Sequence, residues 1–184
     1  MSIKVNLKDI SYRSISEDDK ELISNFISYE KELEKFLVED AIINQIAGVS
    51  RTYLFLNKNK LAGYITLLND ALRLDDNLIT FFKNKNIHYK TLPAIKVGRL
   101  AVDDRYLRKG IGTIMLMLAY TVGKQICDKK CGCRFIILDA KKNKNFKKDP
   151  IHFYKKLNFK ILKKRIKGTI PMYLDIRLEN KFIK

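Results

Sequence analysis

The chain has 184 residues, of which 37 are Lys or Arg and 20 are Asp or Glu, giving a formal net charge of +17. We expect a single domain over residues 1–184, because one α/β unit of this length can bury a sizeable core. The longest mostly apolar stretch, residues 111–122, is far shorter than the ~18 residues that cross a membrane, and the N-terminus lacks the apolar block of a secretory signal. We therefore exclude a membrane protein and expect a soluble, cytoplasmic one.

The first half of the chain predicts a helical segment followed by a β-hairpin. Apolar residues recur at three- and four-residue spacing through residues 17–47, which is typical of amphipathic helix, and Ser16 with Asp19 forms a candidate N-cap. Residues 51–56 and 61–68 are apolar and rich in strand-forming types. The polar residues 57–60 separate these two runs, so we expect a hairpin here.

The second half alternates between helices and strands. Residues 75–90 predict a short helix plus a loop, and a strand over 97–102 follows Pro93. A helix is expected over 112–126, a buried strand over 134–140, a helix turning into a strand over 151–159, and a last strand over 171–178. The pattern predicts a mixed α/β sheet with helices on both faces.

The most informative segment is RLAVDDRYLRKGIGT, residues 99–113, which we call the cradle. An apolar strand runs into a basic turn, and Gly110 and Gly112 bracket Ile111 where a long apolar helix begins. Glycines allow backbone N–H groups to approach an anion closely, and the first N–H groups of a helix favour negative charge. Arg105, Arg108 and Lys109 add positive charge, so a polyanionic cofactor is the expected ligand. The alternative is that the two glycines only ease a strand-to-helix turn.

Two well-known phosphate-binding motifs do not fit the cradle. A Rossmann turn would need a third glycine at the position of Met115 and an acidic residue about 20 positions later. A P-loop would need Gly-Lys-Ser/Thr, whereas Gly112 is followed by Thr113 and Ile114.

The cradle resembles motif A of the GNAT superfamily of acyl-CoA-dependent N-acetyltransferases. In that motif a strand ending Leu-Ala-Val leads to Gln/Arg-x-x-Gly-x-Gly/Ala, and Leu100-Ala101-Val102 and Gly110-Ile111-Gly112 match it. Leu107 stands where the family usually has Gln or Arg, and Arg108 is the candidate to supply the missing polar group. The departure affects a side-chain contact and leaves the backbone contacts intact.

A second match lies in the expected order downstream. The family often carries Phe-Tyr-x-x-x-Gly-Phe, and here Phe153-Tyr154 is followed by Asn158-Phe159. Asn tolerates the left-handed conformation better than other non-glycine residues, so it can close a helix where the family has Gly. The chain between Ala140 and Phe153 is longer than usual for the family, so either Asn143 or Asn145 can correspond to the family's cofactor-contacting asparagine, and Asn143 is our candidate.

The resemblance implies a GNAT-like fold with a mostly antiparallel central sheet, splayed middle strands and helices on both faces. It also implies acetyl-CoA as cosubstrate and transfer of an acetyl group to a primary amine. The Val102 N–H would polarise the thioester carbonyl, and Tyr154 would be the general acid for the departing sulfur. Tyr154 as a plain sheet-covering residue is the alternative. The cofactor-binding candidates are Leu100, Ala101, Val102, Arg108, Lys109, Gly110, Ile111, Gly112, Thr113 and Asn143.

The sequence does not identify a general base, and it predicts no metal site. Asp103, Asp104, Asp139 and His88 lie near the motifs, but structural or solvated roles suit each of them better, and many family members deprotonate the amine through water. The three cysteines, Cys127, Cys131 and Cys133, have no histidine at a zinc-finger spacing, so we expect no metal.

The sequence defines the acetyl acceptor less well than it defines the cosubstrate. The segments Val97–Val102 and Ser50–Tyr53 look like the GNAT branch of toxins that acetylate the amino acid of charged tRNA, and the basic charge suits tRNA. Membership of this branch would imply an antitoxin partner, and a homodimer is also compatible with the family. Two alternatives to a general amine acetyltransferase therefore stay open. One is a toxin acting on aminoacyl-tRNA, and the other is a non-catalytic acyl-CoA- or RNA-binding module that kept the fold.

Overall fold

The computed structural model describes residues 5–141, 149–163 and 168–178. Its strands form a seven-stranded sheet in the order β1-β2-β3-β4-β5-β7-β6. The chain divides into two compact units, one of residues 5–68 and 97–118 and the other of the remaining described residues. Strands β3 (Lys60–Arg73) and β4 (Thr91–Val102) and helix α5 (Ile111–Lys129) contribute to both units. The prediction of one domain over the whole chain remains a prediction.

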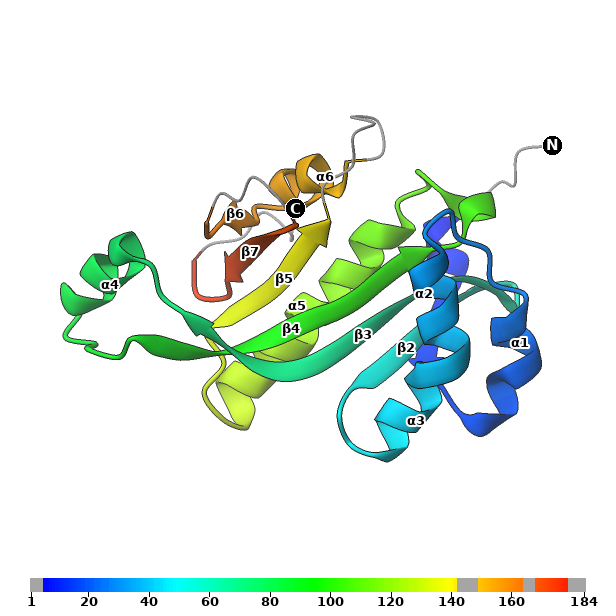
Figure 1. The fold of residues 1–184 in the computed structure, drawn as a ribbon, viewed down its shortest axis with the longest axis horizontal. Coiled ribbons are helices and arrows are strands. Elements are labelled where there is room, and N and C mark those ends of the chain that lie inside the picture. Colours follow the sequence, from blue (N-terminus) through cyan, green and yellow to red (C-terminus); the bar gives the residue numbers. More distant parts are fainter. Residues whose placement is uncertain (1–4, 142–148, 164–167, 179–184) are drawn as a thin grey trace. The chain divides into compact units, whose positions relative to one another are not determined.

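The first unit combines an antiparallel sheet with a helical segment. Strands β1 (Ile10–Ser14) and β2 (Arg51–Asn57) pair with each other, and β2 pairs with β3 as the predicted hairpin, with a register shift at Phe55/Leu56. Two short 3₁₀ turns occur at Leu7–Asp9 and Glu17–Asp19, and a third, η4, follows β4 at Asp104–Tyr106. Figure 1 shows the helical segment beside β2.

The predicted helix over 17–47 is present but interrupted. Helices α1 (Lys20–Ser24), α2 (Lys31–Lys35) and α3 (Ala41–Ile46) replace one continuous helix, and residues 25–30 form a loop between the first two. Residues Phe36–Asp40, η3, have π-type hydrogen bonding, so that the Ala41 N–H donates to the Phe36 carbonyl. Apolar spacing alone cannot reveal such an interruption, because the helices on either side of it keep the same buried face.

Helices cover both faces of the sheet within each unit, as predicted. In the first unit, a Cβ atom added to Gly63 would meet Met115 of α5. The ring of the next residue, Tyr64, stacks on the ring of Phe36 in the helical segment, with the ring centroids 6.3 Å apart. Neighbouring residues of a strand point to opposite faces, so α5 and α2–η3 lie on opposite sides of β3. In the second unit a Cβ on Gly123 of α5 would meet Ile136, while Phe135 contacts Phe82 of α4 at 6.0 Å.

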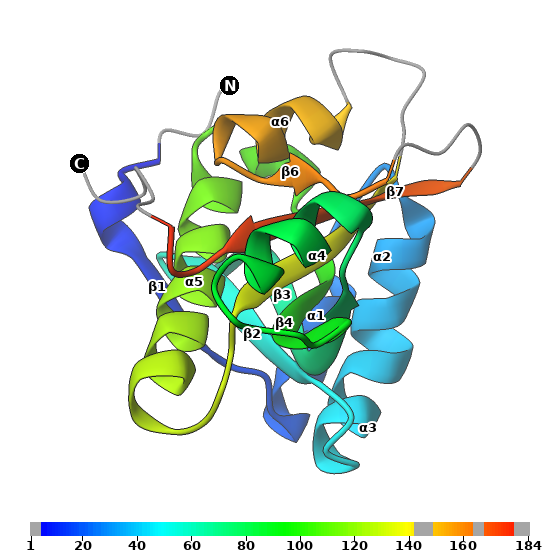
Figure 2. The ribbon, with the colours of Figure 1, turned by 90° about the vertical axis from the view of Figure 1, so that its left-hand side faces the viewer.

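The second unit contains the C-terminal elements (Figure 2). It holds α4 (Asp76–Lys83), β5 (Phe135–Lys141), α6 (Pro150–Lys156), β6 (Lys160–Ile161) and β7 (Thr169–Asp175), and β7 pairs antiparallel with both β5 and β6. The predicted last strand over 171–178 is therefore shifted, because the chain turns after Asp175. A mixed α/β fold with a mostly antiparallel sheet is confirmed. The splay of the middle strands stays a prediction.

Candidate active site

The end of β4 is closely packed against β3. The Asp103 N–H donates to the Ala62 carbonyl at 3.0 Å, so pairing with β3 continues one residue beyond Val102. A Cβ built on Gly63 would lie 2.7 Å from the Ala101 oxygen and 3.3 Å from the Val102 Cα. The absence of a side chain at Gly63 is therefore what lets the Ala101–Val102 backbone lie this near to β3.

The turn of the cradle has the backbone shape of an anion site. Arg108 (φ 60°) and Gly110 (φ 83°) adopt the left-handed conformation, and α5 then starts at Ile111. Gly112 is the second residue of α5, so only one of the two glycines marks the turn. The first N–H groups of an α-helix have no acceptor within the helix, which leaves this end of α5 suited to a phosphate.

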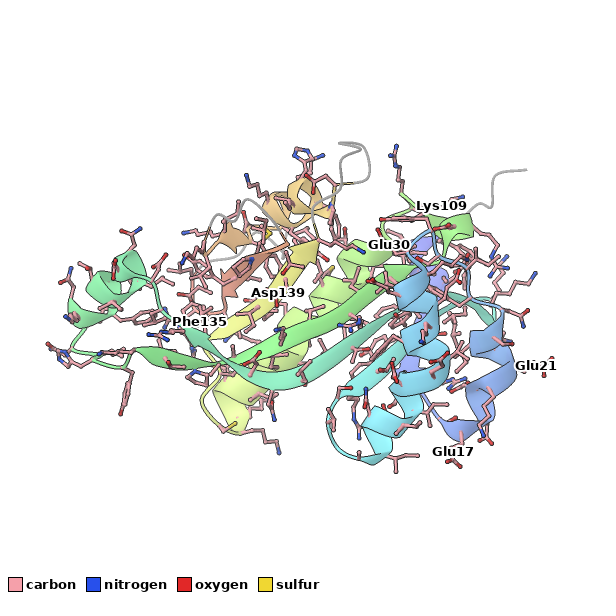
Figure 3. All side chains as sticks on the ribbon, in the orientation of Figure 1. Glu17, Glu21, Glu30, Lys109, Phe135 and Asp139 are labelled. Atoms are coloured by element: carbon pink, nitrogen blue, oxygen red, sulfur yellow. The ribbon has the colours of Figure 1, made fainter. Side chains whose placement is uncertain are left out.

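Two groups that we expected to bind a ligand in the cradle already have partners within the protein. The Thr113 N–H donates to the Gly110 carbonyl at 3.0 Å within the first turn of α5. The Arg105 guanidinium pairs with Asp103 at 2.6 Å, so its charge is compensated. Arg108 is exposed and Lys109 is half-buried in the same turn, where Figure 3 labels Lys109.

Tyr154 belongs to the second unit and lies on α6. The Asp149 carboxylate caps this helix by accepting the Ile151 N–H at 3.0 Å. Asn158 takes the expected left-handed conformation (φ 64°), and the N–H groups of Leu157 and Phe159 both donate to the Tyr154 carbonyl. The Phe-Tyr motif thus builds the helix end that the sequence predicted.

The Tyr154 side chain is 9% exposed, and its ring lies 5.3 Å from that of Phe153 and 5.8 Å from that of Phe159. This aromatic packing fixes the ring. Asn143 and the basic run over 142–148 lie outside the described residues.

Comparison with known protein families decides the assignment, since the model of the acetyltransferase (GNAT) family matches residues 18–159. The chain belongs to the GNAT acetyltransferase family. The match spans the helical segment, the cradle and the Phe-Tyr motif, so it includes every element that carried the resemblance. No curated protein sequence matches this GNAT chain.

Solved structures with the same fold include bacterial toxins and their complexes. A Tyr-to-Phe mutant of KacT is 20% identical, with a TM-score of 0.76 over 92% of this chain and 96% of KacT. AtaT complexed with acetyl-methionyl-tRNAfMet is 21% identical, with a TM-score of 0.72 over 91% and 95%. AtaTR bound with AcCoA is 22% identical, with a TM-score of 0.72 over 93% and 96%. At these identities the likeness shows the fold, which is that of a GNAT acetyltransferase.

Two of the carboxylates near the GNAT motifs have structural partners. Asp103 is fully buried and accepts hydrogen bonds from Arg105 and from the Ile27 N–H. Asp139 pairs with Lys96 at 2.9 Å, and this hydrogen bond raises the pKa of Lys96. Both observations fit the expectation that neither residue is the general base.

The described part of this GNAT chain contains no group of three or more His, Cys, Asp or Glu that could hold a metal ion. Its cysteines are free thiols, and burial raises the pKa of Cys133 to about 11. Within residues 5–141, 149–163 and 168–178, no helix is both long and apolar enough to cross a membrane.

Two features near the cradle were not predicted from the sequence. Arg99, three residues before Val102, lies over the Phe36 ring at 5.0 Å, and the Tyr64 hydroxyl donates to the Leu33 carbonyl at 2.7 Å. The second feature is a set of hydrogen bonds from residues 103–105 to residues 25–27. Each feature joins residues that lie far apart in the sequence, so no local signal indicated either of them.

Proposed function

We propose that the protein transfers the acetyl group of acetyl-CoA to a primary amine by direct attack of the amine on the thioester. The observation that carries this proposal is the left-handed turn at Arg108 and Gly110, which opens α5 directly after the strand that ends at Val102. Such a turn suits a pyrophosphate, and the adjoining strand end suits the acyl part of the same molecule. The related fold of AtaTR, which was solved with AcCoA, supports this choice of cosubstrate.

Cofactor binding rests on backbone groups in this proposal. The N–H groups of residues 108–112 bind the pyrophosphate, with Thr113 as a weaker donor because its N–H already bonds to Gly110. The Leu100–Val102 backbone runs beside the pantetheine, and Asn143 adds a side-chain contact. Because these contacts need no particular side chain at position 107, Leu107 is compatible with binding.

In the chemical step the neutral amine attacks the carbonyl carbon, a C–N bond forms and the C–S bond breaks. The Val102 N–H donates to the carbonyl oxygen as negative charge develops there. Tyr154 gives its phenolic proton to the departing sulfur, and the acceptor nitrogen loses a proton to water. The aromatic packing of Tyr154 supports this role because it limits the positions of the hydroxyl.

Acetyl-CoA calorimetry and thiol release with a panel of amines test the proposal. Tyr154→Phe should slow turnover by on the order of a hundredfold or more while leaving acetyl-CoA affinity unchanged. Tyr173→Phe is the matched control, because it removes a hydroxyl from a half-buried tyrosine of β7 in the same unit. Equal turnover in both variants would refute the role of Tyr154. Lack of cofactor binding would refute the enzyme, and binding without turnover on any amine would favour a non-catalytic module.

A second, narrower candidate is that the amine belongs to aminoacyl-tRNA, which is favoured by the charge of this chain. Residues 17–40 hold nine acidic and three basic side chains, so the other residues carry 34 Lys or Arg against 11 Asp or Glu. Figure 3 labels Glu17, Glu21 and Glu30 in the acidic segment. A polyanion would bind the strongly basic remainder. The related fold of AtaT, solved with acetyl-methionyl-tRNAfMet, supports the same acceptor.

Incubation of the protein with labelled acetyl-CoA and total aminoacyl-tRNA tests this candidate. We expect label in the aminoacyl group, lost on Tyr154→Phe, and a rate that falls steeply with salt. Transfer to free amines but not to charged tRNA would contradict it. This acceptor would also imply a cytoplasmic location and an antitoxin partner, as in the structure of AtaT bound to the C-terminus of AtaR. Growth arrest on expression, relieved by a neighbouring gene, checks the antitoxin, and sedimentation checks the proposed homodimer.

A further inference from the structure

A leucine near the start of the chain packs against the turn of the cradle. A Cβ atom built on Gly110 would lie 3.1 Å from the Leu7 Cδ1, 3.5 Å from the Leu7 Cδ2 and 3.9 Å from the Leu7 Cγ. The isobutyl group of Leu7 therefore covers the side of Gly110 on which another residue would carry its side chain. The two residues lie far apart in the sequence, and the first unit contains both.

Leu7 is held in place by its own 3₁₀ turn, η1 (Leu7–Asp9). The Asn6 side chain caps this turn by accepting the Lys8 N–H at 3.2 Å, and the Asp9 N–H donates to the Asn6 carbonyl at 3.0 Å. The Leu7 carbonyl accepts the N–H of Ile10, the first residue of β1. Because β1 pairs with β2, η1 is joined to the sheet through β1 and contacts the cradle through Leu7.

The backbone of the cradle turn depends on contacts of this kind. Arg108 and Gly110 are both left-handed, and this conformation is unfavourable for a residue that carries a side chain, such as Arg108. Unfavourable backbone conformations persist where the surrounding structure holds them. The contact with Leu7 restricts the position of Gly110, and therefore also the direction of the N–H groups that follow it at the start of α5.

We propose that Leu7 is a positioning residue for the cosubstrate, and that it acts on the pyrophosphate through Gly110. This inference rests on the proposed binding of the acetyl-CoA pyrophosphate by the N–H groups of residues 108–112. A preorganised site binds its ligand more tightly, because less conformational freedom is lost on binding. Loss of the Leu7 side chain should therefore weaken binding of the pyrophosphate and leave the thioester end unaffected. S-acetylpantetheine carries the thioester but no pyrophosphate, so it separates the two effects.

Calorimetry with acetyl-CoA and thiol release from S-acetylpantetheine, with an amine that the wild type acetylates, test the inference. Leu7→Ala should raise the acetyl-CoA Kd about fivefold, since it removes an apolar contact of a few carbon atoms. Thiol release from S-acetylpantetheine, and kcat at saturating acetyl-CoA, should stay within about twofold of wild type. Leu178→Ala is the matched control, because Leu178 has the same 43% exposure but belongs to the second unit. Leu7→Met keeps the side-chain volume and should bind acetyl-CoA like wild type.

Amide hydrogen exchange adds a readout that needs no ligand. Leu7→Ala should speed exchange at Thr113, whose N–H bonds to the Gly110 carbonyl, and Leu178→Ala should not. An unchanged acetyl-CoA Kd in Leu7→Ala, or an equal loss of S-acetylpantetheine use, would overturn the role of Leu7. In both of those results the wild-type protein still binds acetyl-CoA. Failure of the proposed function is different, because there the wild-type protein itself binds no acetyl-CoA.

Discussion

Replacement of Gly63 by alanine should displace the backbone at the end of β4. The new Cβ would lie 2.7 Å from the Ala101 oxygen, against an ordinary contact of at least 3.4 Å, so β3 and β4 must move apart by about 0.7 Å at this point. The Met115 Cε, at 2.1 Å, is the end of a flexible side chain and can rotate away. The strand backbone has no such freedom, because the next N–H, that of Asp103, is bonded to Ala62.

The cost should appear both in stability and in catalysis. Overpacking by one methyl group costs about 1–3 kcal/mol, which for a chain of this size lowers Tm by roughly 3–10 °C. If the Val102 N–H polarises the thioester, a displacement of this size should also lower kcat by on the order of tenfold. The cradle turn at Arg108–Gly110 lies further along the chain, so the acetyl-CoA Kd should change less than kcat.

Thermal unfolding, acetyl-CoA calorimetry and thiol release measure these three quantities. Gly98→Ala is the matched control, because it adds the same methyl group to β4, where the Cβ would meet only the tip of the Leu68 side chain at 2.8 Å. We expect Gly98→Ala to stay near wild type in kcat. If the two variants have the same Tm and the same kcat, the argument that Gly63 sets the position of Val102 is wrong.

Three further predictions concern single side chains. The hydrogen bond from Arg13 lowers the pKa of Asp19, so its contribution to stability is present at neutral pH and is lost as the pH falls through that lowered value. Asp19→Asn should therefore flatten the decline in urea-unfolding free energy below about pH 4. Leu107→Gln should tighten acetyl-CoA binding about threefold by calorimetry, and weaker binding would contradict it. Asn158→Gly should leave Tm nearly unchanged, whereas Asn158→Val should cost about 1 kcal/mol or more.

The parts of the fold that depend on local sequence were predictable. The hairpin of β2 and β3 follows from two apolar runs around a polar turn, and the capping of the segment after Ser16 follows from Asp19, whose carboxylate accepts the Ser16 N–H at 2.8 Å. Gly110 and Asn158 stand where a helix boundary needs the left-handed conformation, and both adopt it. Arg108 adopts it too, although nothing in its chemistry favours that conformation over neighbouring residues.

The interruption of the helix at residues 25–30 was not predictable, because its cause lies outside the segment. Residues 26 and 27 continue the apolar spacing of α1, and by local propensity alone the helix could extend through them. The Asp103 carboxylate and the Asp104 N–H instead capture the backbone of Ile27, and the chain must leave the helix to make those bonds. Local preference was overridden by two contacts to residues 76 and 77 positions away.

The contrast between features set by local sequence and features set by distant contacts also explains why the cosubstrate could be inferred from the sequence and the acceptor could not. The cradle is one continuous segment whose glycine, turn and helix start all lie within residues 103–113, so its ligand follows from local pattern. A surface for the acceptor is built from segments far apart in the sequence, and contacts such as those between residues 25–27 and residues 103–105 follow from no spacing rule. In the sequence Asp103 is one of several carboxylates near the motif, and only its burial and its four hydrogen-bond donors distinguish it from a general base. Those donors come from Arg105 and from the α1–α2 loop, so the carboxylate has the structural role that was expected for it and binds that loop.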